Sequence, residues 1–375
     1  GLRLREASDA LNAFGELYMK QALASGVVPQ ITAVFGNCGG GMAVASAMSD
    51  FTFMESKKAK LFVNAPNALA GNDGSKCDTA CAKFQSEEVG IVDVVAEEAE
   101  LIAQIRELVS MLPANNEDDL SYTDCDDDLN RVCADLEASA ADPAIALPMI
   151  SDEGIFFETK AEYGKDMVTG FIKLNGTTVG AVANRSTLYD EDGNAVEQFN
   201  AEMSARGCEK AASFVKFCDA FNIPVLTLTN AASFKATKCT EKKIAKAAAA
   251  LTAAFAEADV PKVNVVTGKA FGSAYVTMNS KGLGADIVYA WPNAQIGMMD
   301  AKMAVKVMYP EADAKELREK AAAYAELQNS VASAAKRGYV DTVIDAQDTR
   351  KYVIGAFEML FTKREDRPGK KHGTV

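Results

Sequence analysis

The chain has 375 residues, enough for two domains of ordinary size. Hydrophobic residues make up 49% of it and charged residues 24%, a globular balance that excludes a disordered or collagen-like chain. Asp and Glu outnumber Lys and Arg by 52 to 39, which gives a net charge of -13. So acidic a chain repels phosphate backbones, and no basic stripe with interleaved aromatic residues offsets the repulsion. We therefore expect no nucleic-acid partner.

Histidine and cysteine limit the chemistry that the chain can perform. The one histidine, His372, stands in a charged tail near the C-terminus. Ser-His-Asp and Cys-His nucleophile systems and histidine-ligated metals need a well-placed imidazole, so we expect chemistry that does not depend on histidine. The cysteines show no paired CxxC spacing, which predicts reduced thiols and no metal site. They are Cys38, Cys77, Cys81, Cys125, Cys133, Cys208, Cys218 and Cys239.

The sequence carries no pattern of a membrane or exported protein. No apolar run approaches the roughly 18 residues of a membrane-spanning helix. The first residues have no signal-peptide pattern. We therefore expect a soluble cytoplasmic protein.

Two segments of the chain resemble each other at an offset of 232 residues. The first, PQITAVFGNCGGGMAVASAM, begins at Pro29, and the second, PKVNVVTGKAFGSAYVTMNS, begins at Pro261. In both, a β-branched run ends at a glycine, a small-residue turn follows, and a helical pattern resumes. A strand, a glycine turn, a helix and a return strand, used twice, predict an α/β fold with two homologous domains.

The other predicted elements follow in chain order. The Asn175-Gly176 pair between two strand-like runs is a strong hairpin signal. The expected elements are strands ending at Gly36 and around 50–54 and 61–63, hairpin strands over 167–174 and 179–183, a helix over 202–221, a strand over 223–228, strands ending at Gly268 and around 286–290 and 294–297, and helices over 313–337 and 348–362.

An acidic stretch over residues 113–148 separates the two copies. We expect it to be a solvated linker between an N-terminal domain over residues 1–112 and a C-terminal domain over residues 149–375. Asp124 and its neighbours imitate part of a calcium loop. Leu129 stands where that loop needs glycine for its sharp turn, which argues against calcium.

The repeated glycine turns are the best candidates for chemistry. A helix that begins directly after such a turn presents unpaired backbone N–H groups at the positive end of its dipole. These groups can bind a phosphate, or the negative oxygen that develops on a thioester carbonyl or an enolate. Neither turn matches GxGxxG or GxxxxGK[ST], which disfavours a nucleotide. Close strand–helix packing without any chemistry remains the alternative.

Several segments together resemble one family. They are GNCGGG from Gly36, SDFTFM from Ser49, FFE from Phe156, GF at Gly170 with LNG from Leu174, FVKFCDAFNIP from Phe214, KAFGSAY from Lys269 and YAWP from Tyr289. Together they resemble the biotin-dependent acyl-CoA carboxyltransferases: propionyl-CoA carboxylase β subunits, the transcarboxylase core and the carboxyltransferase subunits of decarboxylases. The resemblance covers nearly the whole chain.

The resemblance implies two crotonase-like (ClpP/crotonase) β-β-α domains, with the acyl-CoA on the N-terminal one. The biotin of a biotin carboxyl carrier protein would approach the C-terminal domain of another protomer in a trimer of dimers. A biotin carboxylase or a membrane decarboxylase subunit is a further partner that the resemblance allows. No metal is expected.

The resemblance also assigns roles to the two turns. The amides of Gly40 and Gly41 would polarise the acyl-CoA thioester, and those of Ser273 and Ala274 would stabilise the ureido oxygen of biotin. Free biotin anion would remove the α-proton, which agrees with the scarcity of histidine. The remaining residues expected at the cofactor-binding surfaces are Gly39, Phe271, Gly272 and Tyr275.

The chain departs from the family pattern in several places. Ser273 stands where the family has the second glycine of Gly-Gly-Ala, and residues 230–237 lack the prolines and glycines of a family loop. Residues 246–249, KAAA, replace an Arg-His-Gly-Ala pattern, and residues 77–93 replace a histidine-bearing loop. Family members also carry a further N-terminal segment, which implies that part of the CoA-binding surface precedes this sequence.

Two other functions stay open. Altered loops on a preserved scaffold are also expected of a structural or regulatory subunit without turnover. Another crotonase-type acyl-CoA enzyme, such as a hydratase, isomerase or hydrolase, would need a carboxylate base. Glu158 and Asp300 are the candidates for it.

Overall fold

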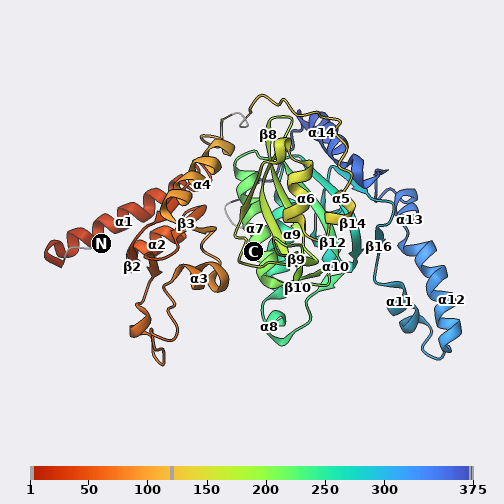
Figure 1. Ribbon diagram of the computed structural model, residues 1–375, viewed down its shortest axis with the longest axis horizontal. Coiled ribbons are helices and arrows are strands. Elements are labelled where there is room, and N and C mark those ends of the chain that lie inside the picture. Colours follow the sequence, from red (N-terminus) through yellow and green to blue (C-terminus); the bar gives the residue numbers. More distant parts are fainter. Residues whose placement is uncertain (1–3, 119–121, 371–372, 374–375) are drawn as a thin grey trace. The chain divides into compact units, whose positions relative to one another are not determined.

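The computed structural model describes residues 4–118, 122–370 and 373, and it divides the chain into two compact units (Figure 1). Unit 1 comprises residues 1–121, 159–163 and 220–222, and unit 2 comprises residues 122–158, 164–219 and 223–375. His372 lies outside the described residues. Among the described residues, no helix combines the length and the apolar composition needed to span a bilayer.

Unit 1 is built on a parallel sheet in the order β1-β3-β5, and β2 pairs with β4 beside it. Its strands are β1 (Ile31–Val34), β2 (Asn37–Gly39), β3 (Phe51–Glu55), β4 (Lys60–Phe62) and β5 (Val94–Ala96). Its helices are α1 (Ala7–Ala24), α2 (Gly41–Ala47), α3 (Ala82–Phe84) and α4 (Glu98–Met111), with a π-helical turn over Gln85–Val89. Its core forms around Val34, Met54 and Leu61, which are buried.

Unit 2 is built on an eight-stranded sheet in the order β17-β15-β14-β12-β8-β7-β6, with β16 pairing to β14. Its strands are β6 (Phe156–Thr159), β7 (Met167–Leu174), β8 (Thr177–Asn184), β12 (Val225–Ala231), β14 (Lys262–Phe271), β15 (Ile287–Ala290), β16 (Gln295–Gly297) and β17 (Thr342–Val343). Two small pairs lie outside it: β9 (Thr187–Tyr189) with β10 (Ala195–Gln198), and β11 (Glu202–Met203) with β13 (Ser233–Phe234).

The helices of unit 2 are α5 (Leu136–Ser139), α6 (Pro143–Ile150), α7 (Ala205–Ala220), α8 (Lys238–Glu241), α9 (Ile244–Glu257), α10 (Gly272–Thr277), α11 (Ala301–Met308), α12 (Ala314–Tyr324), α13 (Val331–Lys336) and α14 (Thr349–Leu360). Of these, α11 and α12 pack on each other and extend away from the sheet (Figure 1). The predicted hairpin of β7 and β8 is confirmed. Asn175 and Gly176 both have positive φ, as a two-residue hairpin turn requires.

The sequence repeat is a repeat of hydrogen bonds as well. In unit 1 the Gln30 amide donates to the Asp50 carboxylate, and in unit 2 the Lys262 amide donates to Asp286, both at 2.7 Å. The strands that follow pair in equivalent registers: Ile31 with Phe51 and Val263 with Ile287, Asn37 with Lys60 and Lys269 with Gln295. In both units, therefore, a carboxylate accepts a hydrogen bond at the start of the first strand of the repeat, and the strands that follow pair in equivalent registers.

A second carboxylate is repeated at the third strand of each domain. Asp93 accepts a hydrogen bond from the Thr52 amide, and Asp341 accepts one from the Val288 amide, both at 2.8 Å. β5 and β17 follow directly and pair in parallel with β3 and β15. The two domains are thus homologous in structure, as the fold prediction requires.

Two predicted helices differ from the observed ones. The segment 313–337 is broken into α12, a π-helical turn over Ala325–Asn329, and α13. The break lies at Ser330, which is extended and caps α13 by accepting a hydrogen bond from the Ser333 amide. The helix expected from residue 202 begins only at Ala205, because Glu202 and Met203 pair with β13.

The boundary between the two units falls inside the segment 113–148 that was expected to be a linker. From residue 122 on, the segment belongs to unit 2. There α5 and α6 bury Leu136 and Leu147 in the main core. The composition indicated a solvated segment because most of its carboxylates are concentrated over residues 117–128, ahead of the apolar residues that enter the core.

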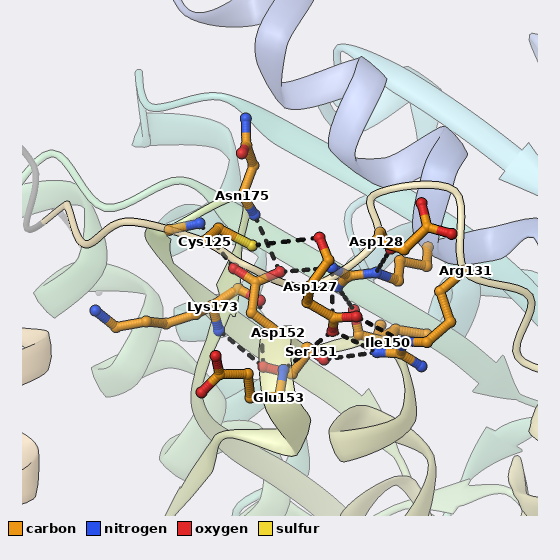
Figure 2. A network of polar contacts seen from close by, with 12 residues as sticks. Cys125, Asp127, Asp128, Arg131, Ile150, Ser151, Asp152, Glu153, Lys173 and Asn175 are labelled. Carbon is orange, nitrogen blue, oxygen red and sulfur yellow. Dashed lines mark hydrogen bonds and ion pairs between the residues drawn. The ribbon is translucent and has the colours of Figure 1, made fainter.

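Two arginines pair with Asp127 of this segment and with Asp152 just after it. Figure 2 shows the network around Asp127 and Asp152. Arg350 is fully buried, donates to the Asp152 carboxylate at 2.7 Å, and lies 3.4 Å from that of Asp127. Arg131 pairs with Asp127 through two hydrogen bonds of 2.9 and 3.0 Å, and this guanidinium chiefly lowers the pKa of Asp127 to about 2. Asp152 also accepts from the Gly176 amide at 2.7 Å. The network joins the acidic segment, the hairpin turn and α14.

Asp127→Asn is expected to lower the free energy of unfolding at pH 7 by about 2 kcal/mol. The substitution removes the carboxylate that pairs with Arg131 and one of the two carboxylates beside Arg350. The pKa of Asp127 is lower in the folded state than its ordinary value of 3.8, so this contribution is complete above that value. It is lost as the pH falls through about 2. Urea unfolding from pH 7 into the acid range measures the difference between variant and wild type.

The control is Asp126→Asn, which removes the same charge from an exposed neighbour. It should change the unfolding free energy by less than about 0.5 kcal/mol. Equal losses for the two variants would show that the ion pairs of Asp127 do not stabilise the fold.

Candidate functional site

The two glycine turns have the same construction. In unit 1, β2 ends at Gly39, Gly40 has a φ of 62°, and α2 begins at Gly41. In unit 2, β14 ends at Phe271 and α10 begins at Gly272, which has a φ of 55°. Each strand therefore passes into a helix through a single left-handed residue, without an intervening loop.

The hydrogen bonds of unit 1 show which amides are available. The Gly40 amide donates to the Phe62 carbonyl oxygen at 2.9 Å, so it extends the pairing of β2 with β4. α2 begins at the next residue, so the N–H groups of Gly41 and Met42 have no acceptor within the helix. The sequence predicted Gly40 and Gly41 as the donor pair. The structure leaves Gly41 in that pair and adds Met42 in place of Gly40.

In unit 2 the equivalent position is held by Ser273 and Ala274, whose role as a donor pair stays a prediction. α10 begins at Gly272, so the N–H groups of Ser273 and Ala274 have no acceptor within the helix. At the offset of 232 residues, Gly41 corresponds to Ser273 and Met42 to Ala274. The two domains thus offer equivalent pairs of amides once the pair of unit 1 is moved by one residue.

Glycine is required at the turn of unit 2 for two reasons. A φ of 55° is costly for residues with a side chain, and a Cβ at Gly272 would lie 3.1 Å from the Met298 carbonyl oxygen. Ser273 is not buried, so its side chain is accommodated and its amide is kept.

The residues expected at the cofactor-binding surfaces are mostly packing residues. Gly39 lies against the Phe62 ring, where a Cβ would come within 2.7 Å. Phe271 and Tyr275 are buried, and Tyr275 belongs to a core cluster of unit 2. Burial raises the pKa of Tyr275 to about 12, and among the described residues its hydroxyl has no hydrogen-bond partner. These side chains hold the turns in shape rather than line an open surface.

The two alternative bases have structural roles. Asp300 is exposed and caps α11 by accepting a hydrogen bond from the Lys302 amide at 3.0 Å. Glu158 has one carboxylate oxygen 3.6 Å from the guanidinium of Arg185, which also pairs with Asp142 at 2.7 Å. Within the described ranges, no three metal-binding side chains come together.

Asn230 is a site residue that the sequence did not indicate. The pairing of β12 with β14 is interrupted here, because Thr229 lies opposite Val266 but Ala231 lies opposite Ala270. Asn230 fills the resulting bulge. Its side-chain oxygen accepts a hydrogen bond from the Lys269 amide at 3.0 Å.

Both sides of Asn230 are held in place. Its own amide donates to the side chain of Asn184 at 3.0 Å, and Gly268 packs so closely that a Cβ there would lie 2.6 Å from the Asn230 oxygen. Beyond the bulge, β14 leaves β15, pairs with β16 and runs into the turn at Gly272. A bulge of this kind re-aims the end of a strand. No sequence pattern indicated it, because residues 230–237 were notable only for the prolines and glycines that they lack.

The comparison with protein families decides the assignment. Residues 1–375 match the carboxyl transferase domain. The chain belongs to the carboxyl transferase family. It is 36% identical over 396 residues to the propionyl-CoA carboxylase carboxyltransferase subunit of Haloferax mediterranei, with 100% of this chain and 74% of that protein covered. It is 34% identical to the methylmalonyl-CoA decarboxylase α subunit of Propionigenium modestum, with the same coverage.

A solved relative confirms the fold. Transcarboxylase 12S, with hydrolysed methylmalonyl-CoA bound, superposes with a TM-score of 0.92 at 34% identity, covering 100% of this chain and 73% of that one. The family and the two-domain crotonase-like fold predicted from the sequence are therefore confirmed, and so is carboxyl transfer as the general activity of the family.

Asn230→Ala is expected to loosen the turn at Gly272 without unfolding unit 2. Losing the acceptor of the Lys269 amide should raise hydrogen–deuterium exchange over residues 268–276 about fivefold to tenfold, as expected for one hydrogen bond. Mass spectrometry of peptides from this segment measures the change. Asn230→Asp keeps the acceptor and should leave exchange near that of the wild type. Equal protection in both variants would remove Asn230 from the support of the turn.

Proposed function

We propose that this chain is the carboxyltransferase component that moves a carboxyl group between a carrier-bound biotin and an acyl-CoA thioester. The observation that carries the proposal is the pair of equivalent glycine turns, each with two helix-N-terminal amides, in a chain that matches the carboxyl transferase family over its whole length. One turn serves each of the two carbonyl groups that take part in the reaction.

In unit 1, the amides of Gly41 and Met42 act on the acyl-CoA. Both donate to the oxygen of the thioester carbonyl, which becomes negative when the α-proton leaves and the enolate forms. Donors that are already oriented stabilise this charge with little reorganisation, and such stabilisation supplies much of the rate enhancement of many enzymes. Gly40 contributes through its left-handed backbone, which orients the two amides, rather than through its own N–H group.

In unit 2, the amides of Ser273 and Ala274 act on the ureido oxygen of biotin. They stabilise the charge that this oxygen gains as the carboxyl group departs. The chemistry that biotin itself supplies is the transferable carboxyl group and a base for the α-proton of the acyl group. This fits a chain in which Asp300 caps a helix and Glu158 lies beside an arginine.

The relatives support the substrate class and the assembly that we propose. Their names specify propionyl-CoA and methylmalonyl-CoA, and the solved transcarboxylase 12S is described as a hexamer. We propose a short-chain acyl-CoA as the substrate, a biotin carboxyl carrier protein as the donor or acceptor, and a homo-oligomer, a trimer of dimers, as the working assembly.

Carboxyl exchange with free biotin tests the proposal. The chain is incubated with malonyl-, methylmalonyl- and glutaconyl-CoA in turn, and loss of the thioester carboxyl group is followed by mass spectrometry. One thioester should lose it faster than the others. Gly272→Ala should slow that exchange about tenfold or more, because roughly 1–2 kcal/mol of backbone strain displaces the amides that follow.

Gly282→Ala is the matched control, since Gly282 has ordinary φ and open space where a Cβ would stand. It should exchange like the wild type. No exchange with any of the three thioesters, together with no CoA binding in calorimetry of the complete natural chain, would instead assign a structural or regulatory subunit.

A further inference from the structure

Five lysines gather in one short segment of an otherwise acidic chain. We call them the lysine patch: Lys235, Lys238, Lys242, Lys243 and Lys246. All five are exposed. The segment carries a single acidic residue, Glu241, although the chain as a whole has a net charge of -13. Within the described part of the chain, none of the five ammonium groups takes part in an ion pair.

Two lysines of the patch stand where cations destabilise the fold. Lys243 is the N-cap residue of the 14-residue helix α9, and Lys246 lies in its first turn, which has no acidic residue. Positive charge at the positive end of a helix dipole is unfavourable. α12 shows the usual arrangement, with Asp313 as its cap and Glu316 in its first turn. A sequence that breaks a local rule without structural compensation indicates a functional requirement.

Two lysines of the patch, Lys243 and Lys246, stand at the start of α9, and α9 packs against α10, the helix that follows the proposed biotin turn. α9 and β13, which bracket the patch in the chain, both contact α10. The hydroxyl groups of Thr252 in α9 and Thr277 in α10 lie 3.5 Å apart. The start of α9, with Lys243 and Lys246, therefore belongs to a helix that packs on the same helix, α10, that presents the amides of Ser273 and Ala274.

We propose that the lysine patch is the docking surface for an acidic face of the carrier protein that presents biotin to unit 2. This proposal rests on the proposed carboxyl transfer and names the chemistry of its protein partner. A compact acidic partner that touches only the patch gains attraction without meeting the negative charge elsewhere on the chain. A nucleic acid or an anionic membrane presents charge over a wide area and is repelled by that charge. Complementary charges of this kind speed association and select the partner.

The test compares two synthetic peptides that each carry one biotinyl-lysine, flanked either by glutamates or by glutamines. With wild-type protein at low salt, the KM for the glutamate peptide in carboxyl exchange should be about tenfold lower than the KM for the glutamine peptide. About 0.5 M NaCl should remove this difference.

In Lys243→Glu/Lys246→Glu the KM values for the two peptides should become equal. Exchange with free biotin should not change, because neither lysine belongs to the catalytic turns. The melting temperature of this variant should rise, because acidic residues now stand at the start of α9.

The matched control is Lys302→Glu/Lys315→Glu. It makes the same charge change in the first turns of α11 and α12, where both lysines are exposed. It should keep the preference for the glutamate peptide. Lys243→Arg/Lys246→Arg keeps the charge and should keep the preference as well.

Three results would overturn the proposal. The first is equal KM values of the two peptides for wild-type protein. The other two concern Lys243→Glu/Lys246→Glu: a raised KM for acyl-CoA with an unchanged KM for the glutamate peptide, or loss of the wild-type oligomeric state on size-exclusion chromatography. Peptide binding is also measured by fluorescence anisotropy. If wild-type protein shows no exchange with free biotin, the proposed function is contradicted. The role of the patch is then decided by the anisotropy measurement, which shows whether wild-type protein binds the glutamate peptide more tightly than the glutamine peptide at low salt.

Discussion

The structure depends on one backbone constraint, the left-handed glycine that joins a strand directly to a helix. At Gly40 and Gly272 this conformation turns the chain within one residue, so that the first amides of the helix stay unpaired within it. A longer loop would leave these amides poorly oriented. At Gly272 the Met298 carbonyl oxygen also occupies the space that a Cβ would need. The rest of each domain serves to hold this turn in position.

In each unit the segment that leads to the turn, β1 and β2 in unit 1 and β14 in unit 2, is anchored at its start by a carboxylate. Asp50 and Asp286 accept hydrogen bonds from the amides at which the two strands begin. In unit 2 the far end is fixed as well, because Asn230 fills the bulge that redirects β14. A shift of the strand by one residue would change which residues form the turn and the start of the helix. Fixing both ends of the strand therefore also fixes which amides are free.

Local features of the fold could be predicted from the sequence, and non-local ones could not. The hairpin at Asn175 and Gly176 and the two copies of the strand–turn–helix unit follow from short-range patterns. The break at Ser330 depends on a cap that competes with a helical pattern on both sides. The availability of the Gly40 amide depends on Phe62, a residue on another strand, so no local motif reveals it. The polar contacts of the acidic segment include one between residues 222 positions apart, which no short-range pattern can predict.

The two proposals divide the electrostatic work of unit 2 between fixed dipoles and mobile charges. The amides of Ser273 and Ala274 are rigid, so they can stabilise charge that appears only as the carboxyl group departs. A lysine at the same place would bind an anionic ground state equally well and so add little to the rate. Lys243 and Lys246 stand at the start of α9, which packs against α10, outside the turn itself, where flexible and solvated charges favour encounter with a partner rather than the reaction. The same chain can therefore attract its partner strongly at low salt without binding the transferred carboxyl group too tightly to release it.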